Sequence, residues 1–302
     1  MDIAKLASTA NALVTPGKGI LAADESSGTI KRRFDSINTE STDDKRRDYR
    51  EMLFRTDGVD AYISGVILYD ETIRKDAADG TPMVKVLSDR GIIPGIKVDK
   101  GTQPLAGSPN ELVTEGLDGL QARLEEYVSL GAGFAKWRAL FNIGEGAPSA
   151  YCIDVNAHAL ARYAALCQQA GLVPIVEPEV FMEGEHSIKT CYAATKATLL
   201  EVFAQLERQG VALEGMLLKP NMVVSASSAS NRANAETVAA MTVDCFKRTI
   251  PAAMPGIVFL SGGQSPPQAT ARLDALNKLA DPQPWQLSFS YGLALQAPVL
   301  DA

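Results

Sequence analysis

The stretch LEGMLLKPNMVV, Leu213 to Val224, is an apolar run interrupted by one lysine, which Pro-Asn follows at once. This pattern predicts a buried β-strand that ends on Lys219 and carries the ammonium group of that lysine toward a loop. Burial of an unpaired ammonium favours its neutral form, and a neutral amine near pH 7 is a nucleophile. Lys219 is therefore a candidate for a covalent Schiff base. A lysine that ends a strand and points to water would have the same sequence pattern.

Four further apolar runs have charged or polar residues near their C-terminal ends. These residues are Lys97 in GIIPGIKVD, Lys136 and Arg138 in GAGFAKWRAL, Glu177 and Glu179 in GLVPIVEPEV, and Ser261, Gly262 and Gly263 in GIVFLSGG. Lys97, Lys136, Glu177, Lys219 and Ser261 follow one another at intervals of about 40 residues, the length of a strand, a helix and two short loops. The chain is therefore predicted to be a series of βα units of similar size.

A carboxylate and a hydroxyl-rich loop follow the first predicted strand, Ile20 to Ala23. The carboxylate is that of Asp24, the loop contains Ser26 and Thr29, and a basic segment with Arg33 comes next. Free backbone N–H groups with cations close behind them are typical of a phosphate site. An ordinary turn before a basic helix has the same composition, so this loop alone leaves both interpretations open.

Two more apolar stretches complete the set of predicted strands. They are AYISGVILYD and Trp285 to Phe289, and the second precedes Ser290-Tyr291-Gly292. Helical patterns are predicted at about 2–14, 43–56 (capped by Thr42 and ended by Gly58), 82–90, 117–130, 149–170, 187–209, 235–249 and 266–279. Strands that alternate with helices, without a linker or a break in composition, favour a single (β/α)₈ TIM-barrel domain over residues 1–302 rather than an open doubly wound sheet.

The predicted barrel would bring the late residues of seven strands to one mouth, because active sites of such barrels lie at the C-terminal ends of the strands. These residues are Asp24, Lys97, Lys136, Arg138, Glu177, Glu179, Lys219, Ser261 and Ser290. Charges gathered in one cleft shift one another's pKa values, which can hold one lysine neutral and one carboxylate protonated.

Composition excludes several classes of function. The 302 residues are 46% hydrophobic, enough for a sizeable core, and the formal net charge of -7 argues against nucleic acid or anionic membrane as a partner. The N-terminal segment lacks the basic start and apolar core of a signal peptide, and no apolar run approaches the roughly 18 residues of a membrane span. We expect a cytoplasmic protein.

Cysteines and histidines give no sign of a metal site. The residues concerned are Cys152, Cys167, Cys191, Cys245, His158 and His186. The cysteines are scattered through predicted helices without paired spacing, which indicates buried thiols, and neither histidine stands in a ligand motif. We expect neither a metal nor an organic cofactor.

Long motifs across nearly the whole chain resemble one family. ILAADES, GIKVDKGTQPLAG, FAKWR, LARYAALCQQAGLVPIVEPE, LEGMLLKPNMV, FLSGGQS and FSYG are similar to class I fructose-1,6-bisphosphate aldolase of the animal and plant type. The resemblance implies a lyase of glycolysis and gluconeogenesis, which forms a Schiff base, needs no metal and is generally a homotetramer.

The same resemblance implies a role for each matching residue. Lys219 would form the Schiff base, Glu177 would act as acid and base on the carbinolamine, and Asp24 would take the proton of the substrate hydroxyl. Lys136 would assist the carbinolamine chemistry, and Glu179 would tune the lysines. The C1 phosphate would bind to Ser261, Gly262, Gly263 and the Ser290 to Gly292 loop, and the other phosphate end to Ser26, Thr29, Arg33, Lys97 and Arg138.

Two departures from the family pattern concern phosphate binding and the C-terminus. The family has an arginine immediately after Ser-Tyr-Gly, where this chain has Leu293, so a bidentate phosphate contact is missing. After Gly292 only LALQAPVLDA follows, which we expect to be too short for the last covering helix and the C-terminal tail of the family.

Three alternatives stay open. The first is a Schiff-base aldolase that acts on a related, singly phosphorylated ketose, which Leu293 favours. The second is a metal-dependent aldolase, which the shortage of histidines opposes. The third is an inactive barrel retained as a binding or scaffold protein, which only the short C-terminus suggests.

Overall fold

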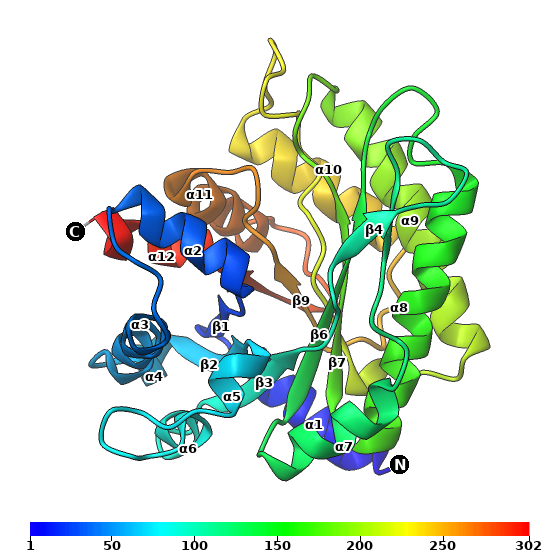
Figure 1. Ribbon diagram of the computed structural model, residues 1–302. Coiled ribbons are helices and arrows are strands. Elements are labelled where there is room, and N and C mark those ends of the chain that lie inside the picture. The colour runs from blue at the N-terminus through cyan, green and yellow to red at the C-terminus, as the bar shows by residue number, and fades with distance from the viewer. Residues whose placement is uncertain (302) are drawn as a thin grey trace.

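Eight parallel strands close into a barrel in the computed structural model, which describes residues 1–301 (Figure 1). The strands are β1 (Gly19–Ala23), β2 (Ile63–Leu68), β3 (Ile93–Lys97), β6 (Phe134–Phe141), β7 (Val173–Val180), β8 (Leu217–Leu218), β9 (Gly256–Phe259) and β10 (Gln286–Tyr291). Strands that follow one another in the chain are neighbours in the sheet, and β1 closes it by pairing with both β2 and β10. The predicted (β/α)₈ fold is confirmed.

Helices lie around the barrel and between its strands (Figure 1). They are α1 (Ile3–Leu13), α2 (Ser27–Ser36), α3 (Asp43–Arg55), α4 (Val59–Tyr62), α5 (Asp70–Ile73), α6 (Met83–Ser88), α7 (Leu120–Ser129), α8 (Ala150–Ala170), α9 (Ile188–Arg208), α10 (Ala235–Lys247), α11 (Pro266–Asn277) and α12 (Leu293–Asp301). Local sequence explains several of the starts. The side chains of Thr42, Ser149, Ser187 and Asn234 each accept a hydrogen bond from a backbone N–H in the first turn of the helix that follows.

The barrel interior is filled at the N-terminal ends of its strands. Leu6 and Leu13 of α1 pack there against buried side chains from the strands, among them Phe134. A Cβ atom at Gly95 would lie 2.3 Å from the Phe134 ring, so only glycine leaves room for that ring. Since this end is packed with apolar side chains, polar groups can gather only at the opposite, C-terminal end of the strands.

The strand predicted to end on Lys219 is much shorter than the apolar run around it. Only Leu217 and Leu218 form β8, and the Lys219 backbone N–H then donates to the Val176 carbonyl at 2.8 Å. Pro220 has no N–H to continue the ladder. The buried chain beyond it is held by side chains: Asn221 Oδ1 accepts from the Val180 N–H, and the Thr242 hydroxyl accepts from the Val223 N–H, both at 2.9 Å.

Other elements also differ from the sequence expectations. The helix expected over 43–56 ends at Arg55, and Gly58, with a φ of 74°, is the N-cap of α4. A short antiparallel pair was not predicted; it joins β4 (Thr102–Pro104) to β5 (Leu112–Thr114). The segment after Gly292, expected to be too short for the full covering helix of the family, forms the nine-residue α12. Ser27 to Thr29 form the first turn of α2 rather than an open loop.

Two further expectations concern thiols and membranes. All four cysteines are buried free thiols, and they lie on α8, α9 and α10 as predicted. Within residues 1–301 we find no helix with the length and apolarity that crossing a bilayer requires.

Candidate active site

Four charged side chains meet at the C-terminal ends of the strands. Lys136 belongs to β6 and Glu177 to β7, while Asp24 and Lys219 directly follow β1 and β8. Lys219 Nζ lies 3.2 Å from Glu177 Oε1, Lys136 Nζ lies 3.2 Å from Glu177 Oε2, and Lys136 Nζ lies 2.7 Å from Asp24 Oδ2. The result is a row of alternating charge, Lys219, Glu177, Lys136, Asp24. Lys219 and Lys136 are each only 4% exposed.

The pKa directions assign protonation states to three members of this row. Burial alone would raise the pKa of Asp24, but the ammonium groups of Lys136 and Lys219 outweigh it and lower this pKa to about 2. Burial would likewise raise the pKa of Glu177, and Lys136, Lys219 and Arg138 lower it overall. Burial would lower the pKa of Lys136, yet Asp24, Glu177 and Asp99 raise it well above its usual range.

At neutral pH Asp24 and Glu177 are therefore carboxylates and Lys136 is an ammonium ion. This differs from the expectation that the cluster could hold one carboxylate protonated, because each carboxylate lies next to at least one ammonium group. Both carboxylates are thus ready to accept a proton rather than to donate one.

Among the buried atoms that have no hydrogen-bond partner within residues 1–301 are two oxygen atoms at the C-terminal ends of the strands. They are Glu177 Oε2, whose approach to Lys136 is close but poorly aligned, and Ser290 Oγ on β10. A buried polar atom without a partner costs about 1–3 kcal/mol, so such atoms are rare in native structures. Their presence at the strand ends marks positions where a polar ligand would complete the hydrogen bonding.

A second ion pair lies next to the row. Arg138 Nε on β6 donates to Glu179 Oε2 on β7 at 2.5 Å, and Glu179 is buried. Lys136 and Arg138 on one strand, like Glu177 and Glu179 on the other, are two residues apart, which places each pair on one face of its strand. A Cβ atom at Gly262 would lie 3.1 Å from Glu179 Oε1, so the loop after β9 passes directly over this carboxylate.

A cavity of about 310 Å³ opens onto the row. Two of the predicted catalytic residues and six of the ten predicted phosphate-binding residues line it: Asp24 and Lys136, and Ser26, Thr29, Arg33, Lys97, Arg138 and Gly292. Lys219 and Glu177 do not line it and follow behind Lys136 in the charged row. Of the remaining predicted residues, Ser261, Glu179 and Ser290 are buried, and Gly263 packs on Met182.

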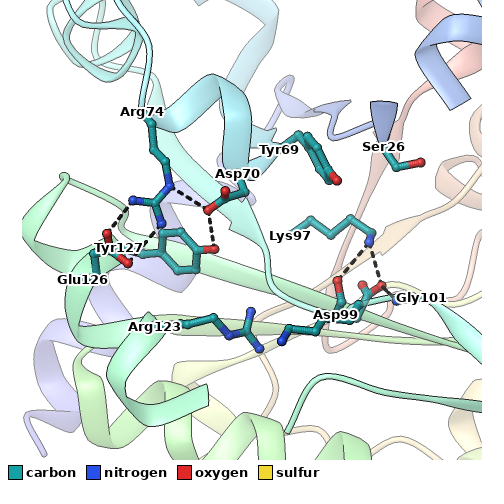
Figure 2. Close-up of a pocket in the computed structure, with 11 residues that line it drawn as sticks. Ser26, Tyr69, Asp70, Arg74, Lys97, Asp99, Gly101, Arg123, Glu126 and Tyr127 are labelled. Carbon is teal, nitrogen blue, oxygen red and sulfur yellow. Dashed lines mark hydrogen bonds and ion pairs between the residues drawn. The ribbon is translucent and has the colours of Figure 1, made fainter. Parts of the chain in front are cut away.

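A larger cavity, of about 550 Å³, adjoins the first and shares Ser26, Lys97, Asp99 and Gly101 with it (Figure 2). Figure 2 shows that many of its charges are already paired with one another. Arg74 lies between Asp70 and Glu126, and Lys97 Nζ lies 2.7 Å from Asp99 Oδ1. Since the reactive row faces the smaller cavity, we place the chemistry there although that cavity is not the largest.

Comparison with known proteins agrees with this geometry. Residues 5–302 match the family described as "Glycolytic: Fructose-bisphosphate aldolase class-I". The chain belongs to this family of class I aldolases. It is 59% identical over 300 residues to the "Probable fructose-bisphosphate aldolase class 1" of Xanthomonas campestris pv. campestris, and the match covers 99% of this chain and 90% of that relative. The family resemblance read from the sequence motifs is thereby confirmed.

Eukaryotic aldolases are similar to the chain as well. "Fructose-bisphosphate aldolase 5, cytosolic" of Arabidopsis thaliana is 53% identical, over 99% of this chain and 83% of that relative. The aldolase of Plasmodium falciparum, solved in complex with TRAP and a small-molecule inhibitor, superimposes with a TM-score of 0.97 at 50% identity, over 99% of this chain and 86% of that chain. This class I aldolase chain therefore shares both sequence and fold with the family.

Sequence reasoning missed three residues that shape the aldolase cavity. Asp99 pairs with Lys97 and accepts a hydrogen bond from the Arg138 backbone N–H at 3.3 Å. Glu25 forms an ion pair with Arg33, and Gln296 also accepts from Arg33, at 2.7 Å. Asp99 stands two residues after Lys97, and Glu25 stands next to Asp24. The position of Asp99 and Glu25 at the ends of predicted strands could therefore have identified both. No local signal marks Gln296.

The structure also bears on the leucine that replaces the arginine expected from the family resemblance. Leu293 begins α12 and is 54% exposed, so it brings no cation to the cavity. Arg33 lies beside Gly292 instead, because a Cβ atom at Gly292 would be 4.0 Å from Arg33 Nη2. The sequence reading put Arg33 and Gly292 at opposite phosphate ends, whereas they lie side by side here.

Proposed function

We propose that this chain catalyses the reversible cleavage of fructose 1,6-bisphosphate to dihydroxyacetone phosphate and glyceraldehyde 3-phosphate, through a Schiff base on Lys219. Membership of the class I aldolase family supports this proposal. The observation that carries it is the buried contact of 3.2 Å between Lys219 Nζ and the Glu177 carboxylate, at the end of the row that reaches the cavity.

The first half of the reaction joins the ketone carbon to Lys219. Lys219 first passes a proton to the Glu177 carboxylate, 3.2 Å away, and the neutral amine then attacks this carbon. The nitrogen passes a second proton to the new alkoxide oxygen, which gives the carbinolamine. Glu177 then returns its proton to the carbinolamine hydroxyl, which leaves as water, and an iminium remains. Lys136 stays charged and stabilises the negative charge on oxygen during these steps, since carboxylates hold it as an ammonium ion.

The second half breaks the carbon–carbon bond. Asp24, whose pKa of about 2 makes it a carboxylate at neutral pH, takes the proton of the substrate hydroxyl next to the scissile bond. The carbonyl of the aldehyde product forms, and the electron pair of the broken bond passes to the iminium, which becomes an enamine. Protonation of the enamine and hydrolysis release the second triose. No metal or organic cofactor takes part in these steps.

The phosphate groups of the substrate are assigned to the rim of the site. Arg33, Lys97 and Arg138 supply positive charge around the 310 Å³ cavity, and Ser26 and Thr29 supply hydroxyl donors. Ser261, Gly262, Gly263, Ser290 and Gly292 would bind the other phosphate, and Arg33, which lies beside Gly292, is assigned to that phosphate with them. The Ser290 hydroxyl, which has no hydrogen-bond partner among residues 1–301, is a ready donor for it.

Turnover tests the proposed activity directly. The purified chain should cleave fructose 1,6-bisphosphate, with both trioses appearing in a coupled assay, and a chelator should not change the rate. Because Leu293 replaces an arginine that the family resemblance led us to expect at the phosphate site, fructose 1-phosphate should be tested beside fructose 1,6-bisphosphate. A higher kcat/KM for the monophosphate would move the assignment to a singly phosphorylated ketose. Absence of turnover with both ketoses would leave an inactive barrel.

Assembly and location complete the proposal. We place the chain in the cytoplasm as a homotetramer; a cytosolic relative supports the location, and the family resemblance supports the assembly. Size-exclusion chromatography with light scattering tests the assembly, and a strict monomer would overturn it.

A further inference from the structure

Gln296 of α12 is fully buried and uses both ends of its side-chain amide. Its Nε2 donates to the Ala22 carbonyl at the end of β1, at 2.7 Å. Its Oε1 accepts from Arg33 Nη1 at 2.7 Å and from the Tyr49 hydroxyl at 2.9 Å. The amide therefore connects the last helix of the described chain to the strand that carries Asp24 and to the helix that carries Arg33.

These contacts leave the Gln296 amide one orientation. A flipped amide would point its Nε2 at Arg33 Nη1, which can only donate, and its Oε1 at the Ala22 carbonyl, which can only accept, so both of these hydrogen bonds would be lost. Tyr49 is itself held by an edge-on contact with the Phe34 ring, 5.5 Å between centroids. Gln296 Oε1 is thus a fixed acceptor rather than a mobile one.

Arg33 is held along one edge of its guanidinium group and open along the other. Nη1 donates to Gln296 and forms an ion pair with Glu25, whose own backbone carbonyl accepts from Arg50 at 2.8 Å. Nη2 makes no hydrogen bond to residues 1–301, and it faces Gly292 at the edge of the 310 Å³ cavity. A guanidinium with one saturated edge and one free edge is oriented for an oxyanion on the free side.

The chemistry of the two partners matters as well as their position. Glu25 neutralises the charge of Arg33, and a second carboxylate in place of Gln296 would make the group net negative and repel phosphate. A neutral amide fixes the guanidinium without adding negative charge. The missing side chain at Gly292 leaves the free edge open, since a Cβ atom there would lie 4.0 Å from Nη2.

We propose that Gln296 is a positioning residue, which orients the Arg33 guanidinium so that its free edge binds a phosphate group of the sugar substrate beside Gly292. The inference rests on the proposed aldolase function. Under this proposal Arg33, held in place by Gln296 of α12, provides the positive charge at the Gly292 side of the cavity. Leu293, the first residue of α12, provides none. Gln296 touches no substrate; it acts through Arg33.

The test begins with Gln296→Met, which keeps the volume of the side chain and removes its hydrogen bonds. We expect the KM for fructose 1,6-bisphosphate to rise about tenfold, as for a weakened charge-assisted contact, while kcat changes less than about twofold. The matched control is Gln168→Met. Gln168 is another buried amide, bonded to the Ala212 N–H and carbonyl and the Gly215 carbonyl, at the end of α8 remote from the cavity. Its replacement should lower the Tm and leave KM unchanged.

A double-mutant cycle shows whether Gln296 acts through Arg33. In an Arg33→Met background, Gln296→Met should leave KM unchanged, because the group that it positions is gone. Tyr49→Phe, which keeps the ring packing and is expected to fold normally, should raise KM about two- to threefold alone and not at all in that background. A merely structural role would lower the Tm and kcat, with effects that multiply in the double variant, and this result would overturn the proposal.

The wild-type protein separates this inference from the proposed function. Its own cleavage of fructose 1,6-bisphosphate, measured in the same series, decides the function. The differences in KM among the variants decide the positioning role. An active wild type with an unchanged KM in Gln296→Met would reject the positioning role and leave the function standing.

Discussion

At the scale of single residues, the site depends on an alternation of charge that no member of the row could sustain alone. Lys136 lies between Asp24 and Glu177, and each buried ion has an opposite charge within 3.2 Å. Burial of any one of these ions without its partners would cost several kcal/mol, so the loss of one member should destabilise the others. The same contacts keep Asp24 and Glu177 ionised, so that they can accept protons, and keep Lys136 positively charged.

Removing the central cation should therefore be severe. We expect Lys136→Met to lower the free energy of unfolding by about 3–5 kcal/mol at pH 7, because two buried carboxylates lose their shared partner. Urea titration measures this loss. The loss should shrink as the pH falls, because without Lys136 the two carboxylates take up protons at a higher pH than in the wild-type protein, where the pKa of Asp24 is about 2. A loss that stays below about 1 kcal/mol would mean that the row contributes nothing to stability.

Stability should fall in acid for the same reason. The folded pKa of Asp24, about 2, lies below its ordinary value of 3.8, and the pKa of Glu177 is lowered as well. A lowered folded pKa gives stability that is present above the unfolded value and lost as pH falls toward the folded value. The free energy of unfolding should thus decline between about pH 4 and pH 2. Asp24→Asn should flatten this decline, and an unaltered pH profile would contradict the assignment.

The carboxylate next to Lys219 should matter for rate more than for binding. Glu177→Gln keeps the size of the side chain and removes its ability to exchange protons. We expect kcat to fall about 10²- to 10⁴-fold, with KM changed far less. Steady-state kinetics measures both constants, and a kcat within tenfold of wild type would assign the proton transfer to another group.

At the scale of elements, the strand that presents Lys219 is the least regular of the barrel. β8 has two residues, and hydrogen bonds that the side chains of Asn221 and Thr242 accept from backbone N–H groups replace the ladder beyond it. The stretch Leu213 to Val224 did not reveal this short strand, because nothing local shows that Asn221 would accept from β7 or that Thr242 of α10 would accept from Val223. The position of Lys219 was predictable from the run, but its support was not.

Asn221 offers the test of that support. Asn221→Leu removes the acceptor of the buried Val180 N–H and leaves it unpaired, so the protein should lose about 1–3 kcal/mol of stability. Because the substitution lies two residues from Lys219, kcat should fall as well. Tyr163→Phe, which also removes a buried hydrogen bond, to the Ile175 carbonyl, is the control and should spare kcat. Equal kcat values in both variants would show that the local support is unimportant.

At the scale of the whole molecule, repeated local patterns predicted the barrel and the residues at its mouth. Each βα unit could be read by itself, and the barrel rule then brought Asp24, Lys136, Glu177 and Lys219 together. The contact between Gln296 and Arg33 could not be read in this way, since 263 residues separate the two and neither stands in a motif that refers to the other. The pKa directions were likewise out of reach, because they depend on which charges become neighbours.

The first residue of α12 allows a test of how complete the phosphate site is. Leu293→Arg places a cation next to Gly292, and a charge-assisted contact to phosphate contributes roughly 1.5–3 kcal/mol. We expect KM for fructose 1,6-bisphosphate to fall by about one to two factors of ten with kcat little changed, since the contact is similar in ground and transition states. An unchanged KM would show that Arg33 already serves this position fully.

The central claim is that Lys219 forms the covalent intermediate, and borohydride trapping tests it most directly. Reduction in the presence of dihydroxyacetone phosphate should add the mass of a reduced triose phosphate to the peptide that contains Leu217 to Met222. Lys219→Met should abolish the adduct. An adduct on Lys136 or Lys97 in the wild-type protein, or none at all, would contradict the account.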